Sequence, residues 1–364
     1  MAALSFLALL GCSPYRPFDS VAHLRSQFAA RAGAETAAAL RVPFELDAEI
    51  TALIDARYKA HPNQRRRVEQ VLNFVFERLG LRYSLVPTRD AVGTFRAREG
   101  NCLSFVNLFV GVARHLRLSP FYVEVTDYQR WDYRDGMVVS HGHIVAGLRT
   151  AGELETYDFL PYRAKTYRGF QPIDDLTATA HFYNNLGAEA MMAGDFAGGE
   201  ELIRAAVRIA PRFVKALNNL GVCLNRKGDL DGAEEILRRG LEIDRDNVAV
   251  LSNLARLYQT RGDEAAAAAM LARVQGSQHS NPFYFVYEAE RLLAQGDTQH
   301  ALAALVEGLR QDSELPEVHL GFVKAYLALG DLERARHHLE HALKLDATNQ
   351  EARRYAALLA KGPH

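Results

Sequence analysis

Apolar positions recur at helical spacing directly after the sequence Gly100-Asn101-Cys102. They follow the i, i+3, i+4, i+7, i+11 pattern of a helix with one buried face, and they are Phe105, Leu108, Phe109, Val112 and Leu116. Asn101 is a favourable N-cap residue, and Gly100 lets the incoming chain turn sharply. The pattern therefore predicts a helix anchored in a core, with Cys102 in its first turn.

A second amphipathic helix is predicted over residues 64–80, where apolar residues gather on one side and Gly80 ends the pattern. Two helix-like stretches before it, Val21–Arg31 and Asp47–Tyr58, are interrupted by prolines. We expect the segment that holds them, residues 13–63, to wrap around a neighbouring domain and not to form one.

Strand patterns follow the Cys102 helix. Alternating and β-branched residues predict strands at Phe121–Val125, Val138–Leu148 and Leu154–Leu160. Together with the two helices, these strands predict an α+β domain over residues 64–165, in which the Cys102 helix packs on an antiparallel sheet.

From about residue 178 the composition becomes helical and rich in alanine and leucine. A glycine–aspartate pair recurs there every 34 residues, at Gly194, Gly228, Gly262, Gly296 and Gly330. Alanine keeps the same period at Ala233, Ala267, Ala301 and Ala335. This pattern resembles that of tetratricopeptide repeats, in which each unit is a pair of helices with small residues at the contact and glycine at the turn.

The resemblance implies an all-α solenoid over residues 178–364, with five repeats in 180–349 and a capping helix at Gln350–Lys361. Asn185, Asn219 and Asn253 occupy one equivalent position in three successive repeats. In this family an asparagine at that position often lies on the concave face and binds the backbone of an extended peptide. The resemblance therefore implies a protein or peptide partner in the groove; the alternative is that these asparagines lie on a solvated helix face.

Composition and charge argue against several kinds of partner and site. The chain has 364 residues and a net charge of −1, with no long basic run, so we expect no nucleic-acid partner. Its three cysteines, Cys12, Cys102 and Cys223, are too few and too scattered for a disulfide framework or a zinc site. We expect no metal and no cofactor, and Cys223 fits a core position in the second repeat.

Residues 1–12 form an apolar segment too short to span a membrane. Its end, Leu9-Leu10-Gly11-Cys12, resembles a bacterial lipobox, in which Cys12 is lipidated after cleavage, although no Lys or Arg precedes the apolar run. The resemblance implies a signal and a lipid anchor, with the protein on the periplasmic face of the outer membrane. Without such a signal, the segment would be a buried or disordered N-terminus and the protein cytoplasmic.

Cys102 is a candidate nucleophile because a helix N-terminus favours a thiolate over a thiol. The alternative is a small cysteine that only packs. Two strand residues, His143 and Asp158, would complete a thiol site. If the last two predicted strands form a hairpin about residues 149–152, the numbers of any two opposed residues add up to 301, and His143 faces Asp158. His141 would face Leu160, and a bulge would shift the pairing by one residue.

Three short sequences resemble the transglutaminase-like family of papain-like thiol enzymes, over residues 65–162. Gly100–Leu118 resembles the family's nucleophile helix, Gly142–Gly147 its histidine strand and Tyr157-Asp158-Phe159 its aspartate strand. The chain departs from the family where Arg117-Leu118-Ser119-Pro120 replaces a frequent Gly-Ile-Pro. The resemblance implies a catalytic triad of Cys102, His143 and Asp158.

Such a triad transfers the acyl group of a peptide or protein amide, and water or an amine can accept it. We expect hydrolysis in preference to cross-linking, which would make the chain a thiol hydrolase or acyltransferase. The alternative is a non-catalytic adaptor of the cell envelope, in which the repeats assemble a protein complex.

Overall fold

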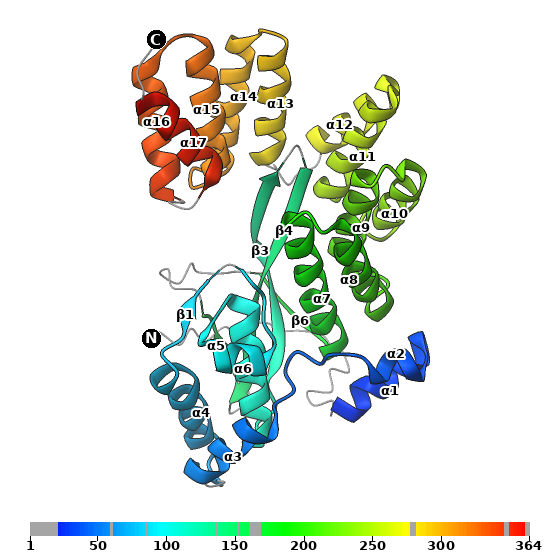
Figure 1. Cartoon of the computed structure of the whole chain (residues 1–364), viewed down its shortest axis with the longest axis vertical. Helices are drawn as coiled ribbons and strands as arrows, with labels where there is room; N and C mark the ends of the chain where they lie inside the picture. Colours follow the sequence, from blue (N-terminus) through cyan, green and yellow to red (C-terminus); the bar gives the residue numbers. More distant parts are fainter. Residues whose placement is uncertain are drawn as a thin grey trace. The chain divides into compact units, whose positions relative to one another are not determined.

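The computed structural model describes residues 21–58, 61–84, 86–134, 137–150, 153–159, 169–276, 282–345 and 349–360. The chain forms two compact units, and Figure 1 colours them along the sequence. The first unit comprises residues 1–130 and 140–239, and the second comprises residues 131–139 and 240–364. The first unit therefore holds the predicted α+β region, apart from residues 131–139, together with the first repeat helices.

The predicted Cys102 helix is α6, Cys102–His115, and it is more deeply buried than its pattern indicates. Every residue from Leu103 to Ala113 is buried, so the helix has no solvent face along most of its length. The Asn101 side chain caps it, since its Oδ1 accepts the backbone N–H of Ser104 at 3.0 Å. This helix forms the centre of the α+β region.

Gly100 has a different role from the one its sequence suggests. It lies in a short strand, and a Cβ atom there would come within 2.5 Å of the Ser104 Cβ. The glycine is needed because helix α6 approaches closely, and not because the chain turns sharply at this point.

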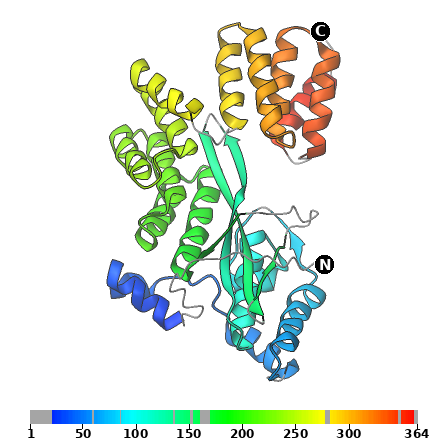
Figure 2. The same ribbon diagram turned by 180° about the vertical axis from the view of Figure 1, so that it is seen from behind.

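The sheet has four strands in the order β5-β4-β3-β6, and Figures 1 and 2 show the long strands β3 and β4 side by side. Their bounds are β3 Phe121–Arg134, β4 Met137–Thr150, β5 Glu153–Tyr157 and β6 Phe170–Ile173. The first predicted strand was too short, and β6 was not predicted. Helix α6 packs on the sheet, where the Phe109 ring stacks on Tyr157 at 5.0 Å and the Tyr122 hydroxyl donates to Asn107 Oδ1 at 3.0 Å.

The elements before α6 include the predicted helices and several short elements that were not predicted. They are α1 Val21–Ala32, α2 Ala34–Ala38, α3 Ala48–Arg57, α4 Gln64–Leu72, the π-helix η1 Asn73–Arg78, β1 Arg82–Tyr83, α5 Ala91–Ala97 and β2 Glu99–Gly100. The helix predicted over 64–80 changes to a π-helix after Leu72. Strands β1 and β2 pair in parallel and, like α5, are too short to give a sequence signal.

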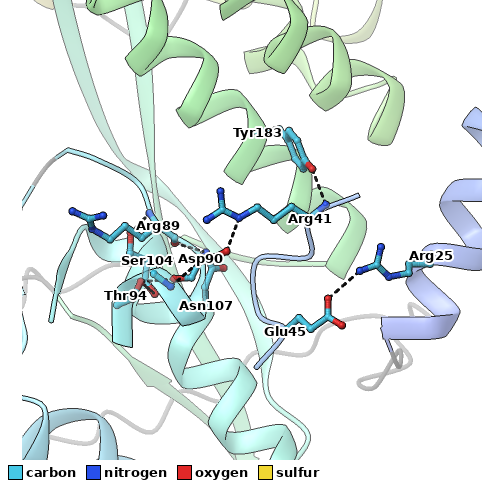
Figure 3. A network of polar contacts seen from close by, with 10 residues as sticks. Arg25, Arg41, Glu45, Arg89, Asp90, Thr94, Ser104, Asn107 and Tyr183 are labelled. Atoms are coloured by element: carbon cyan, nitrogen blue, oxygen red, sulfur yellow. Dashed lines mark hydrogen bonds and ion pairs between the residues drawn. The ribbon is translucent and has the colours of Figure 1, made fainter. Parts of the chain in front are cut away.

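The N-terminal segment contacts both the α+β region and the first repeats (Figure 3). The Arg41 guanidinium pairs with Asp90, which caps α5, and the Arg41 backbone N–H donates to the Tyr183 hydroxyl at 2.9 Å. Arg31 donates to the Ile209 carbonyl at 2.6 Å. The segment thus ties elements of the first unit that are far apart in sequence.

Five helix pairs and one further helix fill the C-terminal part. They are α7 Asp175–Met192, α8 Phe196–Ile209, α9 Val214–Arg226, α10 Leu230–Ile243, α11 Val248–Arg261, α12 Glu264–Gly276, α13 Pro282–Ala294, α14 Thr298–Gln311, α15 Pro316–Ala328, α16 Leu332–Leu345 and α17 Gln350–Ala360. The helices follow one another as antiparallel pairs, as in an all-α repeat array, and the division into five repeats and a capping helix stays a prediction. The first helix, α7, begins at Asp175, ahead of the predicted position 180.

Each predicted glycine–aspartate pair lies at a turn between two helices. The glycine φ angles are +87°, +85°, +76°, +80° and +73° for Gly194, Gly228, Gly262, Gly296 and Gly330. The following aspartates accept a backbone N–H from the first turn of the next helix, at 2.9 Å from Gly198 to Asp195 and at 3.0 Å from Gly232 to Asp229. The pair therefore ends one helix and caps the next.

A buried ion pair joins the end of α6 to the start of α7. The Arg114 guanidinium donates two hydrogen bonds of 2.7 Å to the Asp175 carboxylate, and the two side chains are only 8% and 5% exposed. The same guanidinium lies over the Phe44 ring, 4.4 Å from its centroid. Residues from the N-terminal segment, the central helix and the first repeat therefore meet at this point.

The sheet also contacts the repeats within the first unit. Glu124 on β3 pairs with Lys215 on α9, and His181 on α7 is buried nearby, with its ring 4.3 Å from that of Phe213. Burial lowers the pKa of His181 to about 4, so the ring is neutral beside the Lys215 cation at neutral pH.

The second unit has its own polar link between helices. Lys324 on α15 pairs with Glu290 on α13 at 2.6 Å and with Glu351 on α17 at 2.9 Å. Because α17 also packs on the apolar side of α15, this link fixes the last helix over the end of the array.

We expect Arg114→Met to destabilise the first unit by about 3–5 kcal/mol, because it leaves the buried Asp175 carboxylate without its cation. Adding Asp175→Leu to Arg114→Met should restore much of the loss. Urea unfolding of the full chain measures both. The control is Arg66→Met, which removes an exposed pair with Glu69 and should cost less than about 1 kcal/mol; equal losses in Arg114→Met and Arg66→Met would contradict the prediction.

The turn at Gly228 offers a second test. A Cβ atom there meets nothing within 4 Å, so Gly228→Ala should cost about 1–2 kcal/mol through backbone conformation alone. Gly228→Asn should cost less, since asparagine tolerates the left-handed region. Thermal unfolding compares the two variants, and equal losses would show that φ is not the cause.

Candidate thiol site

His143 and Asp158 are hydrogen-bonded at the sheet. The His143 Nε2 atom lies 2.9 Å from the Asp158 Oδ1 atom. His143, on β4, is 2% exposed, whereas Asp158, directly after β5, is 22% exposed. The carboxylate thus fixes the orientation of the ring through Nε2, and Nδ1 is the ring nitrogen that does not contact Asp158.

The strand register that brings them together differs from the predicted one. Ala146 pairs with Tyr157 and Thr150 with Glu153, so paired numbers add up to 303 and not to 301. Continued by one residue, this register would place Asp158 opposite Val145. His143 and Asp158 are then diagonal neighbours on one face, which remain within reach because a shift of two residues preserves the face.

Packing of the next residue holds Asp158 in place. The Phe159 ring is buried and contacts Phe76 at 5.0 Å, Phe109 at 5.7 Å and Phe105 at 6.2 Å between ring centroids. Two of these partners belong to α6, the helix that carries Cys102. The aromatic cluster therefore fixes the aspartate relative to the cysteine.

Cys102 completes the group, at the first position of α6 with its side chain partly exposed. The Cys102 sulfur lies near enough to the His143 ring to influence its charge. Burial opposes a charged ring, but the hydrogen bond to Asp158 and the neighbouring Cys102 and Asp158 groups outweigh it and raise the pKa of His143 to about 9. The site therefore favours an imidazolium beside the sulfur at neutral pH.

The competing histidine stays untested. His141 also lies on β4, but its side chain lies outside the described part of the structure, as does Leu160.

A polar cluster that the sequence did not indicate supports the start of α6. The Asn101 Nδ2 donates to the Thr88 hydroxyl at 2.7 Å, and Glu189 on α7 accepts from both the hydroxyl and the backbone N–H of Thr88, at 2.6 and 2.7 Å. Thr88 and Glu189 lie 101 residues apart in sequence, so no local pattern could have connected them.

The asparagines predicted to bind a partner differ in exposure. Asn219 and Asn253 are buried and Asn185 is partly exposed. The Asn219 Nδ2 donates at 2.9 Å to the Oδ1 of Asn184, a residue that the repeat pattern did not single out. A peptide bound at Asn219 would have to replace this bond, and the role of the three asparagines stays a prediction.

The other cysteines fall in different places. Cys223 is fully buried in α9, as predicted for a core residue, and burial raises its pKa to about 11. Cys12 lies outside the described residues. Among the residues that the structure covers, no helix is long and apolar enough to cross a membrane, and no three histidine, cysteine or acidic side chains are placed to hold a metal ion.

Two family models of the tetratricopeptide repeat match the chain, one at residues 184–248 and the other at 226–284 and 292–362. The C-terminal part is a tetratricopeptide-repeat solenoid. All of the matched residues lie in the predicted solenoid, residues 178–364, so the transglutaminase-like resemblance continues to rest on the three short sequences alone. No curated protein sequence matches the chain.

Solved structures similar to this chain are also repeat proteins. A thermophilic tetratricopeptide-repeat protein from Thermus thermophilus is 16% identical, with a TM-score of 0.42, and the match covers 50% of this chain and 99% of that one. A repeat protein from Parabacteroides merdae is 14% identical over 51% of this chain and 75% of its own, with a TM-score of 0.43. YrrB, described as having an unusual peptide-binding site, is 15% identical over 49% and 92%, with a TM-score of 0.31.

The raised pKa of His143 predicts how the ring titrates. Its contribution to stability is complete below the unfolded value near 6.5 and is lost as the pH rises through about 9. Cys102→Ala removes the sulfur that favours the charged ring, so the pKa of His143 should fall. Proton NMR of the ring measures the shift; Cys223→Ala is the control, and an unchanged pKa in Cys102→Ala would contradict the coupling.

Proposed function

We propose that this chain is a protein-interaction scaffold that carries a cysteine-dependent acyl-transfer site. The repeats support the first part, because tetratricopeptide arrays present helix surfaces to protein or peptide partners. The hydrogen bond between His143 and Asp158, with the Cys102 sulfur near the same ring, supports the second part.

The geometry suits each step of amide hydrolysis. The Cys102 thiolate attacks the carbonyl carbon, and the His143 imidazolium donates its proton to the leaving nitrogen, which departs as a free amine or ammonia. The acyl group remains as a thioester on the sulfur. Neutral His143 then takes a proton from water, whose oxygen attacks the thioester and releases the carboxylic acid and the thiolate.

Asp158 acts through the ring. Its bond to Nε2 keeps that nitrogen protonated and directs Nδ1 towards the sulfur. The Asn101 cap takes the Ser104 N–H of the first turn of α6, so the N–H groups of Cys102 and Leu103, which precede the first i to i−4 bond of the helix, would be the ones to stabilise the developing oxyanion.

The repeats and the N-terminus suggest where the reaction takes place. We propose that the repeat groove, including Asn185, Asn219 and Asn253, holds a protein or peptide partner. A lipid on Cys12 would keep the chain at the cell envelope, facing the periplasm.

A non-catalytic adaptor is the second candidate, and the family matches favour it because they cover the repeats and not the thiol site. In that function the Cys102 group would be a remnant that stabilises the first unit. The two candidates differ in whether Cys102 reacts faster than a free thiol.

The decisive experiment compares wild type with Cys102→Ala and Asp158→Asn on a mixed peptide library containing glutamine, with and without a labelled primary amine. We expect new peptide termini or deamidated glutamine in mass spectra with wild type and none with Cys102→Ala. Asp158→Asn should fold normally and turn over slower by orders of magnitude, since the ring loses its fixed tautomer.

Two results would favour the adaptor instead. One is the absence of turnover together with iodoacetamide labelling of Cys102 that begins only near the free-thiol range, about pH 8. The other is labelling that His143→Ala leaves unchanged. Incorporation of the labelled amine in place of hydrolysis would assign transamidation to the same triad.

A further inference from the structure

We propose that Glu189, in the first repeat helix, is a positioning residue for Cys102. The inference rests on the proposed function of Cys102 as a nucleophile. It follows from a continuous set of hydrogen bonds, here called the Glu189 relay, which is made of Glu189, Thr88, Asn101 and Ser104.

The relay can run in only one direction. An ionised carboxylate only accepts hydrogen bonds, so the Thr88 hydroxyl must donate its single proton to Glu189 at 2.6 Å. The hydroxyl oxygen is then the acceptor for the Asn101 Nδ2, at 2.7 Å. Glu189, together with the Ser104 backbone N–H, which can only donate, thereby fixes which end of the Asn101 amide faces Thr88.

That choice determines the start of helix α6. With its nitrogen turned to Thr88, Asn101 presents Oδ1 to the Ser104 backbone N–H at 3.0 Å and to the Ser104 hydroxyl at 2.9 Å. The Ser104 hydroxyl oxygen accepts the Arg89 backbone N–H at 2.8 Å, which returns the relay to the loop that carries Thr88. Cys102 lies between the capping residue Asn101 and the capped residue Ser104, so its backbone is held on both sides.

Burial makes each bond in the relay difficult to replace. Thr88, Asn101 and Ser104 are 3%, 6% and 0% exposed. If one partner is removed, water cannot easily take its place, so the next group in the relay is no longer held in a single orientation. A reversed Asn101 amide would direct an NH₂ group at the Ser104 N–H and abolish the cap.

The relay connects the repeats to the thiol site through Glu189. Glu189 belongs to α7, the first helix of the repeats, whereas the other three residues surround the thiol site. The geometry of Cys102 thus depends on a carboxylate supplied by the interaction module.

The test uses full-length Glu189→Ala, Glu189→Gln and Thr88→Val, with Glu201→Ala, an exposed glutamate on α8, as the matched control. Mass spectrometry of the Cys102 peptide measures its iodoacetamide alkylation from pH 5 to 9, at a temperature where circular dichroism shows folded protein. We expect Glu189→Ala and Thr88→Val to slow alkylation at pH 7 by roughly five- to tenfold, the effect of about one buried hydrogen bond.

Glu189→Gln keeps an oxygen acceptor and should retain most of the rate, and Glu201→Ala should match wild type. Alkylation within twofold of wild type in both Glu189→Ala and Thr88→Val, with only a lower melting temperature, would overturn the proposal. If Glu189→Ala does not fold, Thr88→Val decides alone, since it keeps the backbone bond to Glu189. Alkylation requires no substrate, so this outcome is independent of whether wild type hydrolyses an amide.

Discussion

The buried ion pair between Arg114 and Asp175 is the contact on which the first unit depends. Burying two charges is costly unless they are paired in good geometry, and here the guanidinium meets the carboxylate through two bonds of 2.7 Å. One partner ends the central helix and the other begins the repeats. The α+β region and the first repeats are therefore held together, because separating them would leave each of these charged side chains without its partner.

The sequence predicted most of this architecture because the governing signals are local. The glycine–aspartate period marks the turn within each helix pair, since a positive φ and an N-cap each demand particular residue types. Asn101 was correctly predicted as a cap for the same reason. Strand β6 escaped prediction because four residues that include Pro172 carry no periodicity, and α6 was thought to have one buried face because a sequence cannot show what covers the other.

The candidate site was likewise predicted where local patterns determine it and missed where tertiary packing does. Period-two alternation placed His143 and Asp158 on one face, and a register error of two residues left that face unchanged. Their catalytic role stays a prediction. Thr88 and Glu189 could not be foreseen, because their contact closes a loop of 101 residues and depends entirely on tertiary packing.

The same long-range contact has a consequence for the order in which the protein is made. A ribosome releases Asn101 and Cys102 well before α7, so the growing chain carries an incompletely supported thiol until the first repeat helix emerges. The hydrogen bonds that support the Asn101 cap of helix α6 are therefore complete only after α7 has been made, and this part of the first unit cannot reach its final geometry before the first repeat helix emerges.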